Sequence, residues 1–180
     1  MYEKQHLTDT GFNTILSLYA SINRGMSPKV LTVFPNIVPV DKIRVVLPKD
    51  LNPYWVSGFT AGDGGFSIGI RKSTQQIYFR FHIAQHSRDI DLMNLLIKFF
   101  GCGNVNIRSN LNRCDYYIQD FSKIYENIIT HFDSYPLYNI KYLDYLDFKQ
   151  AVELFKIGGK DNIEAIKTLI SNMNSKRIFK

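Results

Sequence analysis

The residue best placed to do chemistry is Asp63, the single acid in a stretch that reads NPYWVSGFTAGDGGF from position 52 to 66. Asn52 and Pro53 suit the N-cap and first position of a helix, and the glycines after Asp63 can end one. A carboxylate at a helix C-terminus faces the negative end of the helix dipole, so a cation beside it is favourable. The pattern indicates a helix that delivers an acid, and a metal ion with it, to a ligand beyond its end. The alternative is that Asp63-Gly64 is only a turn.

One face of this predicted helix has almost no side chains. Gly58, Ala61 and Gly62 stand at positions i, i+3 and i+4, which share one side of an α-helix. Glycine in a helix interior costs about 1 kcal/mol relative to alanine, so two glycines in five residues indicate a packing reason. Close approach of a second backbone is the simplest one. We therefore expect Gly58, Ala61 and Gly62 to form a helix–helix interface.

The nine residues 56–64, VSGFTAGDG, resemble the signature of the LAGLIDADG homing endonucleases. Ala61 stands where the family name has its first aspartate, and Gly62 takes the following alanine position. Asp63 takes the position of the acid that the family uses for metal binding. The resemblance therefore implies that Asp63 is catalytic, that Asp63 and Gly62 belong to a metal site, and that the cofactor is Mg²⁺ or another divalent cation.

Alternating apolar and polar residues predict four strands after this helix, because a period of two is typical of strands with one buried face. The predicted strands are 66–71, 76–84, 104–108 and 113–119. The predicted helices are 52–63, 89–100, about 121–133, about 141–157 and 162–176. This order matches the α+β class of the resembled family. It implies the LAGLIDADG homing-endonuclease fold, αββαββα, in which a four-stranded antiparallel, saddle-shaped sheet carries helices on one face.

The polar positions of the predicted strands could contact nucleic acid. Arginine pairs well with guanine, and asparagine or glutamine with adenine, in the major groove. A solvated sheet face would also be polar, but such a face usually mixes many Lys and Glu, whereas these positions carry four arginines and one acid. The predicted nucleic-acid contacts are Ser67, Gly69, Arg71, Gln76, Tyr78, Arg80, His82, Asn104, Asn106, Arg108, Arg113, Asp115, Tyr117 and Gln119.

Two other features near these strands have competing interpretations. His82 and His86 have the spacing of a helical metal pair, but they lie in a predicted strand, so we expect no metal between them. Gln85 is ambiguous. Lys141, which follows YPLYNI, stands where related enzymes often place a lysine near the scissile phosphate. The resemblance makes Lys141 a catalytic candidate, and the alternative is an ordinary lysine at a helix N-terminus.

Composition narrows the class of protein. The 180 residues carry a net charge of +6, which suits a polyanionic partner without proving one. Cys102 and Cys114 have neither zinc-site nor disulfide spacing, and no apolar run approaches membrane-spanning length, so no membrane partner is expected. The first ten residues lack the Arg-rich, acid-poor character of a transit peptide. Abundant Asn, Ile, Tyr, Phe and Lys fit an AT-rich genome, and with the resemblance they suggest a mitochondrial, organelle-encoded protein.

The chain begins with a segment that resembles its own end. Residues 7–25 are predicted as a capped amphipathic helix. A shift of 151 residues superposes its apolar positions on the terminal helix: Phe12 on Ile163, Ile15 on Ile166, Leu18 on Leu169 and Ile22 on Met173. We interpret 1–25 as the remnant terminal helix of a preceding repeat, 26–50 as a Pro-containing linker that cannot be regular helix, and 51–180 as a single LAGLIDADG domain. The alternative is that any two amphipathic helices align at some offset.

The resemblance implies a sequence-specific double-strand DNA endonuclease, or the C-terminal half of one, that hydrolyses phosphodiesters with a divalent metal. A double-strand break needs two active sites, and the chain has one motif acid. Activity is therefore expected to require a second LAGLIDADG domain, from a homodimer or from a separate N-terminal half. The alternatives are an RNA-splicing maturase or non-catalytic nucleic-acid-binding protein on the same fold, and a decayed intron reading frame. The sequence does not separate double-stranded DNA from intron RNA as the partner.

Overall fold

The computed structural model describes residues 3–22, 25–41, 46–109 and 111–175. It divides into two compact units, Met1–Val46 and Leu47–Lys180, and each unit is described by itself.

The first helix of the N-terminal unit, α1, covers Asp9–Ser21 and follows a 3-10 turn at Gln5–Leu7. Thr8 caps it, because the threonine Oγ1 accepts a hydrogen bond from the N–H of Gly11. This helix lies within the segment predicted as helix, of which residues 23–24 fall outside the described part.

A second helix of this unit, α2, covers Pro28–Val33. The expectation that the stretch after residue 25 contains no regular helix is therefore wrong for these six residues. Pro28 occupies the first helical position, where the missing N–H costs nothing, and the Ser27 side chain caps the helix by accepting from Val30 N. The spacing of the prolines predicted an interruption of helical structure in this segment, whereas Pro28 begins a short helix.

The C-terminal unit starts with the predicted motif helix, α3, which covers Pro53–Asp63. Asn52 Oδ1 accepts hydrogen bonds from the N–H groups of Tyr54 at 2.9 Å and Trp55 at 3.3 Å. The helix ends at Asp63 because Gly64 has extended backbone and begins the first strand. The local signals of cap, proline and glycine pair thus predicted both ends.

The four predicted strands form one antiparallel sheet in the order β1-β2-β4-β3. The strands are β1 Gly64–Ile70, β2 Ile77–His86, β3 Asn104–Arg108 and β4 Arg113–Ile118. The strand β4 pairs with β2 only from Phe81 to His86, whereas β1 pairs with β2 from residue 77 to 83. The β1–β2 hairpin therefore extends past the end of β4.

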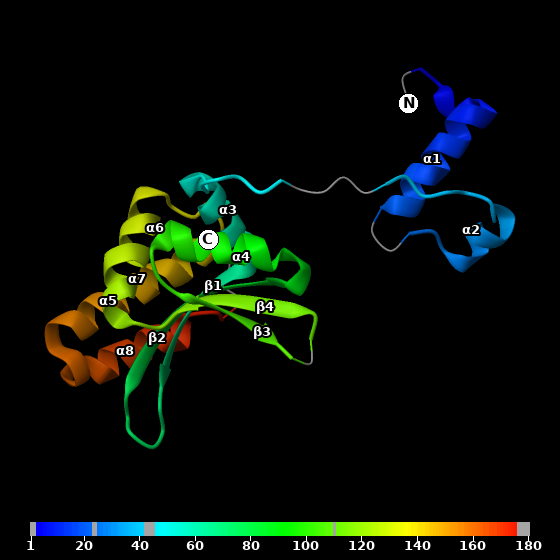
Figure 1. The fold of residues 1–180 in the computed structure, drawn as a ribbon. Coiled ribbons are helices and arrows are strands. Elements are labelled where there is room, and N and C mark those ends of the chain that lie inside the picture. The colour runs from blue at the N-terminus through cyan, green and yellow to red at the C-terminus, as the bar shows by residue number, and fades with distance from the viewer. Residues whose placement is uncertain (1–2, 23–24, 42–45, 110, 176–180) are drawn as a thin grey trace. The chain divides into compact units, whose positions relative to one another are not determined.

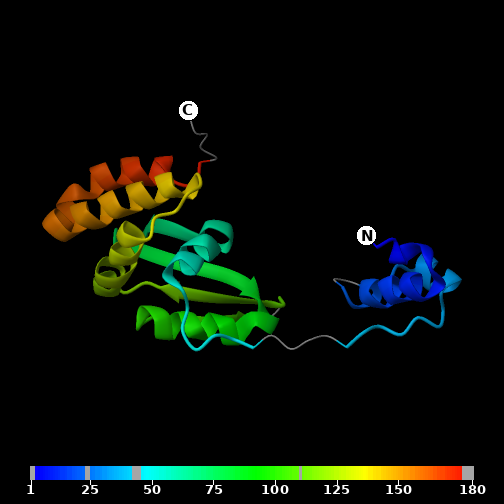
Figure 2. The ribbon, with the colours of Figure 1, turned by 90° about the horizontal axis from the view of Figure 1, so that it is seen from above.

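Helices pack against one face of the sheet and leave the other face open (Figure 1). α4 ends at Gly101, which has the left-handed φ of 67° that glycine adopts without strain. The helical segments are the 3-10 turn Ser87–Asp89, α4 Ile90–Phe100, α5 Phe121–Lys123, a π-helical stretch Ile124–Ile129, α6 Thr130–Ser134, α7 Lys141–Gly158, the 3-10 turn Gly159–Asn162 and α8 Ile163–Asn172. Figure 2 shows α7 and α8 side by side.

The core lies between the sheet and these helices. Phe66 of β1 contacts Phe81 of β2, and its ring also meets Phe132 of α6 and Phe148 of α7, with centroids 5.3 Å apart in both cases. Because these apolar side chains occupy alternate strand positions, their polar neighbours point to the open face. No helix in the described ranges is long and apolar enough to cross a membrane.

Candidate active site and nucleic-acid interface

Asp63 lies at the junction of α3 and β1 with its side chain exposed. Gln85, near the end of β2, donates a hydrogen bond from Nε2 to Asp63 Oδ2 at 2.9 Å. Sequence reasoning assigned Gln85 no role. The signal was available, because a hairpin that turns at 73–75 pairs Gly64 with Ile83 and so brings Gln85 beside the end of the motif helix.

Lys141, the first residue of α7, reaches the C-terminal turn of α3. Its Nζ lies 2.9 Å from Thr60 O, 3.0 Å from Ala61 O and 2.6 Å from Gly64 O. Thr60 O also accepts the N–H of Gly64, and Ala61 O also accepts from Asn139 Nδ2 at 2.9 Å. The ammonium adds a charged donor to these carbonyls at the C-terminal end of α3, where the helix dipole favours a cation. Burial lowers the pKa of Lys141, while the negative charge of Asp63 raises it. Its contacts are thus more than those of an ordinary lysine at the start of a helix.

The donors at this helix end suit a divalent cation but do not complete a site. Asp63 offers a carboxylate and Gly62 a backbone carbonyl, whose oxygen lies 3.4 Å from Lys141 Nζ. Mg²⁺ prefers such oxygen ligands in octahedral geometry, together with water and phosphate. In the part of the chain that the structure describes, no group of three or more His, Cys, Asp or Glu side chains could hold a metal ion. The residues therefore fit one side of a metal site.

The two histidines of β2 have separate surroundings. His86 Nδ1 accepts a hydrogen bond from Arg88 N at 3.1 Å and caps the turn after the strand. His82 lies on the open face beside Gly65. Burial lowers the pKa of His82, and the positive charge of Arg80 lowers it further. The two histidine side chains are therefore held by different neighbours.

The small-residue face of α3 is open within this unit. A Cβ added at Gly58 or Gly62 would meet no atom of the described residues within 4 Å. Beside the glycines, the side chains of Tyr54 and Trp55 are 62% and 42% exposed. A groove of about 350 Å³ runs past Gly58 and Ala61 to the loop 136–139. The helix therefore presents glycines flanked by exposed aromatic rings, and nothing in the described part of this unit covers the glycines.

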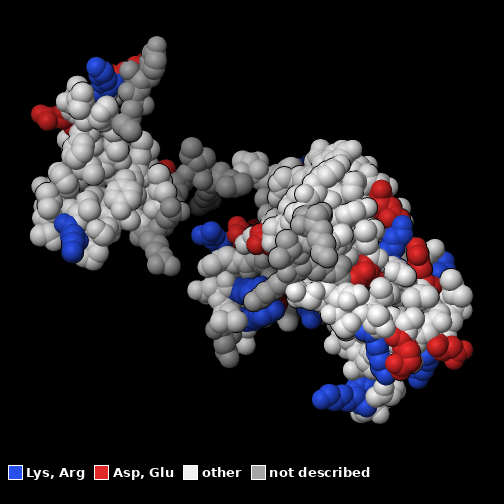
Figure 3. Space-filling model, turned by 180° about the vertical axis from the view of Figure 1, so that it is seen from behind, with Lys and Arg blue, Asp and Glu red and all other residues white. Residues whose placement is uncertain are grey.

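The predicted contact residues lie on the open face of the sheet, and their exposure differs. Exposed are Arg71, Gln76, Tyr78, Asn104, Asn106, Arg108, Arg113 and Gln119. Half-buried are Ser67, Gly69, Arg80, His82 and Tyr117. Basic residues stand at both hairpin ends, Arg71 and Lys72 at one and Arg108 and Arg113 at the other. Figure 3 shows blue side chains on these projections, and a mixture of red and blue over the helical side.

Rings from β2 cover the glycines of β1 on this face. A Cβ at Gly69 would lie 2.2 Å from the ring of Tyr78, and one at Gly65 would lie 2.9 Å from the ring of His82. The guanidinium of Arg80 lies 4.8 Å from the centroid of the Tyr117 ring, within the range of a cation–π contact. These contacts hold the larger side chains in place, so Gly69 contributes space rather than a hydrogen-bonding group.

Asp115 is the one predicted contact residue whose side chain is buried, with 4% exposed. Arg108 Nε donates to Asp115 Oδ2, and Arg113 Nε lies 3.9 Å from Asp115 Oδ1. Alternation correctly gave the direction of this carboxylate. It could not show that two arginine side chains cover it.

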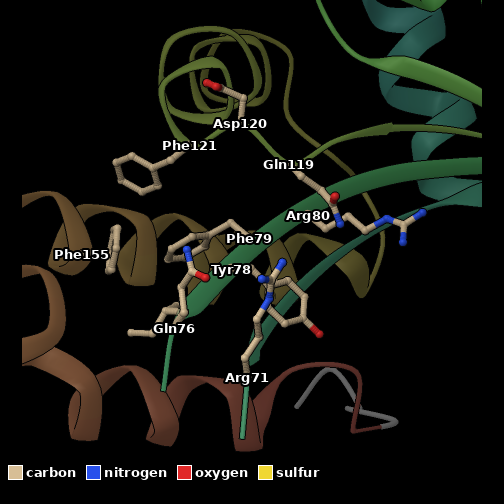
Figure 4. A pocket seen from close by; sticks show the side chains of 10 residues that line it. Arg71, Gln76, Tyr78, Phe79, Arg80, Gln119, Asp120, Phe121 and Phe155 are labelled. Carbon is tan, nitrogen blue, oxygen red and sulfur yellow. The ribbon is translucent and has the colours of Figure 1, made fainter. Parts of the chain in front are cut away.

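A hollow of about 720 Å³ continues the open face past the end of β4 (Figure 4). It adjoins the part of β2 that pairs with β1 alone. Its polar lining brings together five predicted contact residues, and its helical side carries phenylalanines. The lining includes Arg71, Gln76, Tyr78, Arg80 and Gln119 on the polar side and Phe79, Phe121 and Phe155 on the other. The open face of the sheet is therefore hollowed beside the end of the β1–β2 hairpin.

The amino-acid sequence is similar to those of several known proteins. A family model described as LAGLIDADG endonuclease matches residues 56–152. Probable intron-encoded endonuclease 2 of Neurospora crassa is 36% identical over 168 residues, covering 87% of this chain and 36% of that protein. Probable intron-encoded endonuclease 3 of the same fungus is 31% identical over 173 residues, with 92% and 32% covered. The uncharacterized mitochondrial protein RF1 of Saccharomyces cerevisiae is 33% identical over 105 residues, with 54% and 20% covered. The chain thus spans about a third of the length of the two endonucleases.

Solved structures resemble the whole described fold. The I-SmaMI LAGLIDADG homing endonuclease bound to cleaved DNA matches with a TM-score of 0.92 and 33% identity, covering 99% of this chain and 62% of that chain. I-SmaMI was also solved on an uncleaved DNA target in the presence of calcium ions. I-GzeII in complex with its DNA target matches with a TM-score of 0.92 and 27% identity, with 98% and 64% covered. These structures confirm the fold expected from the sequence.

Proposed function

The chain belongs to the LAGLIDADG endonuclease family, and we propose that it supplies one half of an enzyme that cuts both strands of a specific DNA site. The observation that carries this proposal is the end of α3, where an exposed Asp63 stands next to an unpacked face of small residues. LAGLIDADG endonucleases cleave DNA with divalent metals. The same helix end can therefore hold an ion and meet a second motif helix.

We assign each residue at this end a role. Asp63 would hold the divalent cation, which we take to be Mg²⁺, with the Gly62 carbonyl beside it. A bound Mg²⁺ would help to generate the attacking hydroxide and stabilise charge on the phosphate. Gln85 holds the Asp63 carboxylate in one orientation. Lys141 fixes the end of α3 and places a positive charge where the scissile phosphate would approach.

A second LAGLIDADG domain would complete the enzyme. One carboxylate and one carbonyl leave most of the coordination of a Mg²⁺ ion to other groups, and a partner helix packed on Gly58 and Gly62 would bring its own acid to the same place. This partner is a second copy or a separately made first half. The exposed Tyr54 and Trp55 would be buried in that pairing.

The open face of the sheet would bind the DNA target. It presents arginine and amide side chains in the spacing of adjacent strands, and such groups recognise guanine and adenine edges in the major groove. We propose mitochondria as the location, in keeping with the relatives' descriptions as intron-encoded and mitochondrial. Intron RNA is the alternative ligand of this face.

The test is incubation of the full chain with duplex DNA that spans an intron-insertion site, alone and with a first-half partner. We expect both strands to be cut with Mg²⁺ and neither to be cut with EDTA. Asp63→Asn removes a metal ligand and little volume, so cutting should be abolished while DNA affinity stays within a few-fold. Continued cutting by purified Asp63→Asn would remove Asp63 from the catalytic role. Binding of intron RNA without DNA cutting by the wild type would favour the maturase alternative.

A further inference from the structure

Asp115 is a buried acid on a face that otherwise offers arginines, amides and hydroxyls. In the sheet register it stands opposite Asn106 on one side and Ala84 on the other. Neither neighbour carries a charge. A buried carboxylate is costly unless cations pair with it, so the structure provides Asp115 with cations from two positions further along the strands.

Those cations are Arg108 and Arg113, which lie directly opposite each other on β3 and β4. Like charges at directly paired positions destabilise a sheet. The carboxylate between them offsets this repulsion, because Arg108 Nε donates to Oδ2 and Arg113 Nε lies 3.9 Å from Oδ1. Asp115 Oδ1 is buried and has no hydrogen-bond partner among the residues that the structure describes. Asp115 is therefore hydrogen-bonded to Arg108 but not to Arg113, whose Nε lies beyond hydrogen-bonding distance.

The arginine nitrogens that face Asp115 are not available to a ligand, so the remaining arginine nitrogens determine what can be bound. An arginine has one N–H at Nε and four on its two terminal nitrogens. Asp115 uses the Nε of Arg108 and faces the Nε of Arg113. The two arginine side chains are still 45% and 50% exposed. Their terminal nitrogens form the edge that bonds guanine O6 and N7 in a bidentate manner.

We propose that Asp115 is a specificity-determining positioning residue that holds Arg108 and Arg113 for reading guanines in neighbouring base pairs. This inference rests on the proposed DNA-binding function of the sheet. In the complex, Arg113 closes on Oδ1, so that both guanidiniums are fixed at Nε and present their terminal nitrogens to the major groove. Asp115 itself touches no base.

The experiment measures base preference with the full chain and Ca²⁺ in place of Mg²⁺. Intron-insertion-site duplexes are randomised one base pair at a time, and binding is compared for wild type, Asp115→Asn and Asp91→Asn. Asp91 is an exposed acid in the first turn of α4, so its variant matches the change in net charge. We expect Asp115→Asn to lose about tenfold or more of the guanine preference at one or two base pairs and to keep the rest of the profile, as Asp91→Asn keeps all of it.

A second arm separates base recognition from phosphate contact. Replacing guanine by 7-deazaguanine at those base pairs removes the N7 acceptor and leaves the phosphates unchanged. Wild-type binding should fall about tenfold, and binding by Asp115→Asn should change little. Arg108→Lys and Arg113→Lys keep the charge but lose the bidentate fork, and each should affect the same base pairs.

Three results would overturn the proposal. If Asp115→Asn keeps the wild-type profile, or if 7-deazaguanine has no effect on wild-type binding, the arginines do not read guanine through this arrangement. If Asp115→Asn loses preference at every position together with a lower melting temperature, the acid serves the fold alone. The proposed function fails separately, because a wild type without preference at any base pair would not be a sequence-specific nuclease.

Discussion

Gln85 and Asp63 are joined by a hydrogen bond of 2.9 Å, which links the end of β2 to the end of the motif helix. Partners that orient a metal-binding side chain typically contribute about 10- to 100-fold to activity or metal affinity. We therefore expect Gln85→Ala to cut DNA about 10- to 100-fold more slowly, with DNA affinity nearly unchanged. Single-turnover cleavage and binding in Ca²⁺ measure the two effects. Gln76→Ala, at the other end of β2, is the control and should lower affinity rather than rate.

Removing the lysine cap should loosen the end of α3. Lys141→Met leaves the carbonyls of Thr60, Ala61 and Gly64 without their charged donor, which we expect to cost about 1–3 kcal/mol of unfolding free energy. Urea unfolding measures this loss. Lys98→Met is the matched control, because Lys98 pairs with Asp50 on the surface and such pairs contribute about 0–1 kcal/mol. Equal losses in the two variants would show that Lys141 does not cap the helix.

Stability should fall in mild acid because of His131. Its Nε2 lies 3.2 Å from Ser57 Oγ, which donates its own proton to Tyr135 O, so Nε2 donates to the hydroxyl. Burial lowers the pKa of His131 from 6.5 to about 4. Between these values the unfolded chain binds a proton that the folded chain does not. The contribution of His131 to the free energy of unfolding is therefore fully present above about pH 6.5 and is lost as the pH drops toward 4.

The expected size of this effect is about 2–3 kcal/mol. Urea unfolding at pH 7.5 and pH 5.0 should show a smaller pH dependence for His131→Gln than for wild type. The variant keeps an N–H donor for Ser57 and removes the titration. His82, whose pKa is also lowered, acts in the same direction in both proteins, so it cancels in the comparison. An unchanged pH dependence would show that His131 does not titrate in this way.

Substitutions on the open face of α3 should separate folding from pairing. Gly58→Ala adds a methyl group that meets no atom in this unit and gains up to about 1 kcal/mol of helix propensity. We expect it to stabilise the chain and weaken its association. Gly58→Leu or Gly62→Leu should abolish association and cutting together while the fold remains. Sedimentation at varied concentration and circular dichroism test this, and a strict monomer that cuts both strands would contradict it.

The sequence predicted the parts of the fold that depend on neighbouring residues. Asn52 and Pro53 define the start of α3, and alternation separates the core side chains of β2 from those on the open face. Contacts between residues far apart in the chain were not predictable in this way. Lys141 reaches α3 from 77 to 81 residues away, and its role depends on how α7 packs. Asp115 shows the same limit. The alternation along a strand predicts the face to which its side chain points, but not that the side chains of Arg108 and Arg113 bury it there.

The ring of Tyr78 over Gly69 sets a rule for anyone who redesigns the DNA target. A Cβ at position 69 would lie 2.2 Å from the outer end of that ring, so the Tyr78 side chain must move to accept any residue larger than glycine. A replacement of Gly69 therefore also moves the Tyr78 side chain, so its effect on DNA binding is not that of position 69 alone. A change of DNA specificity in this part of the face is therefore best sought by varying positions 69 and 78 together.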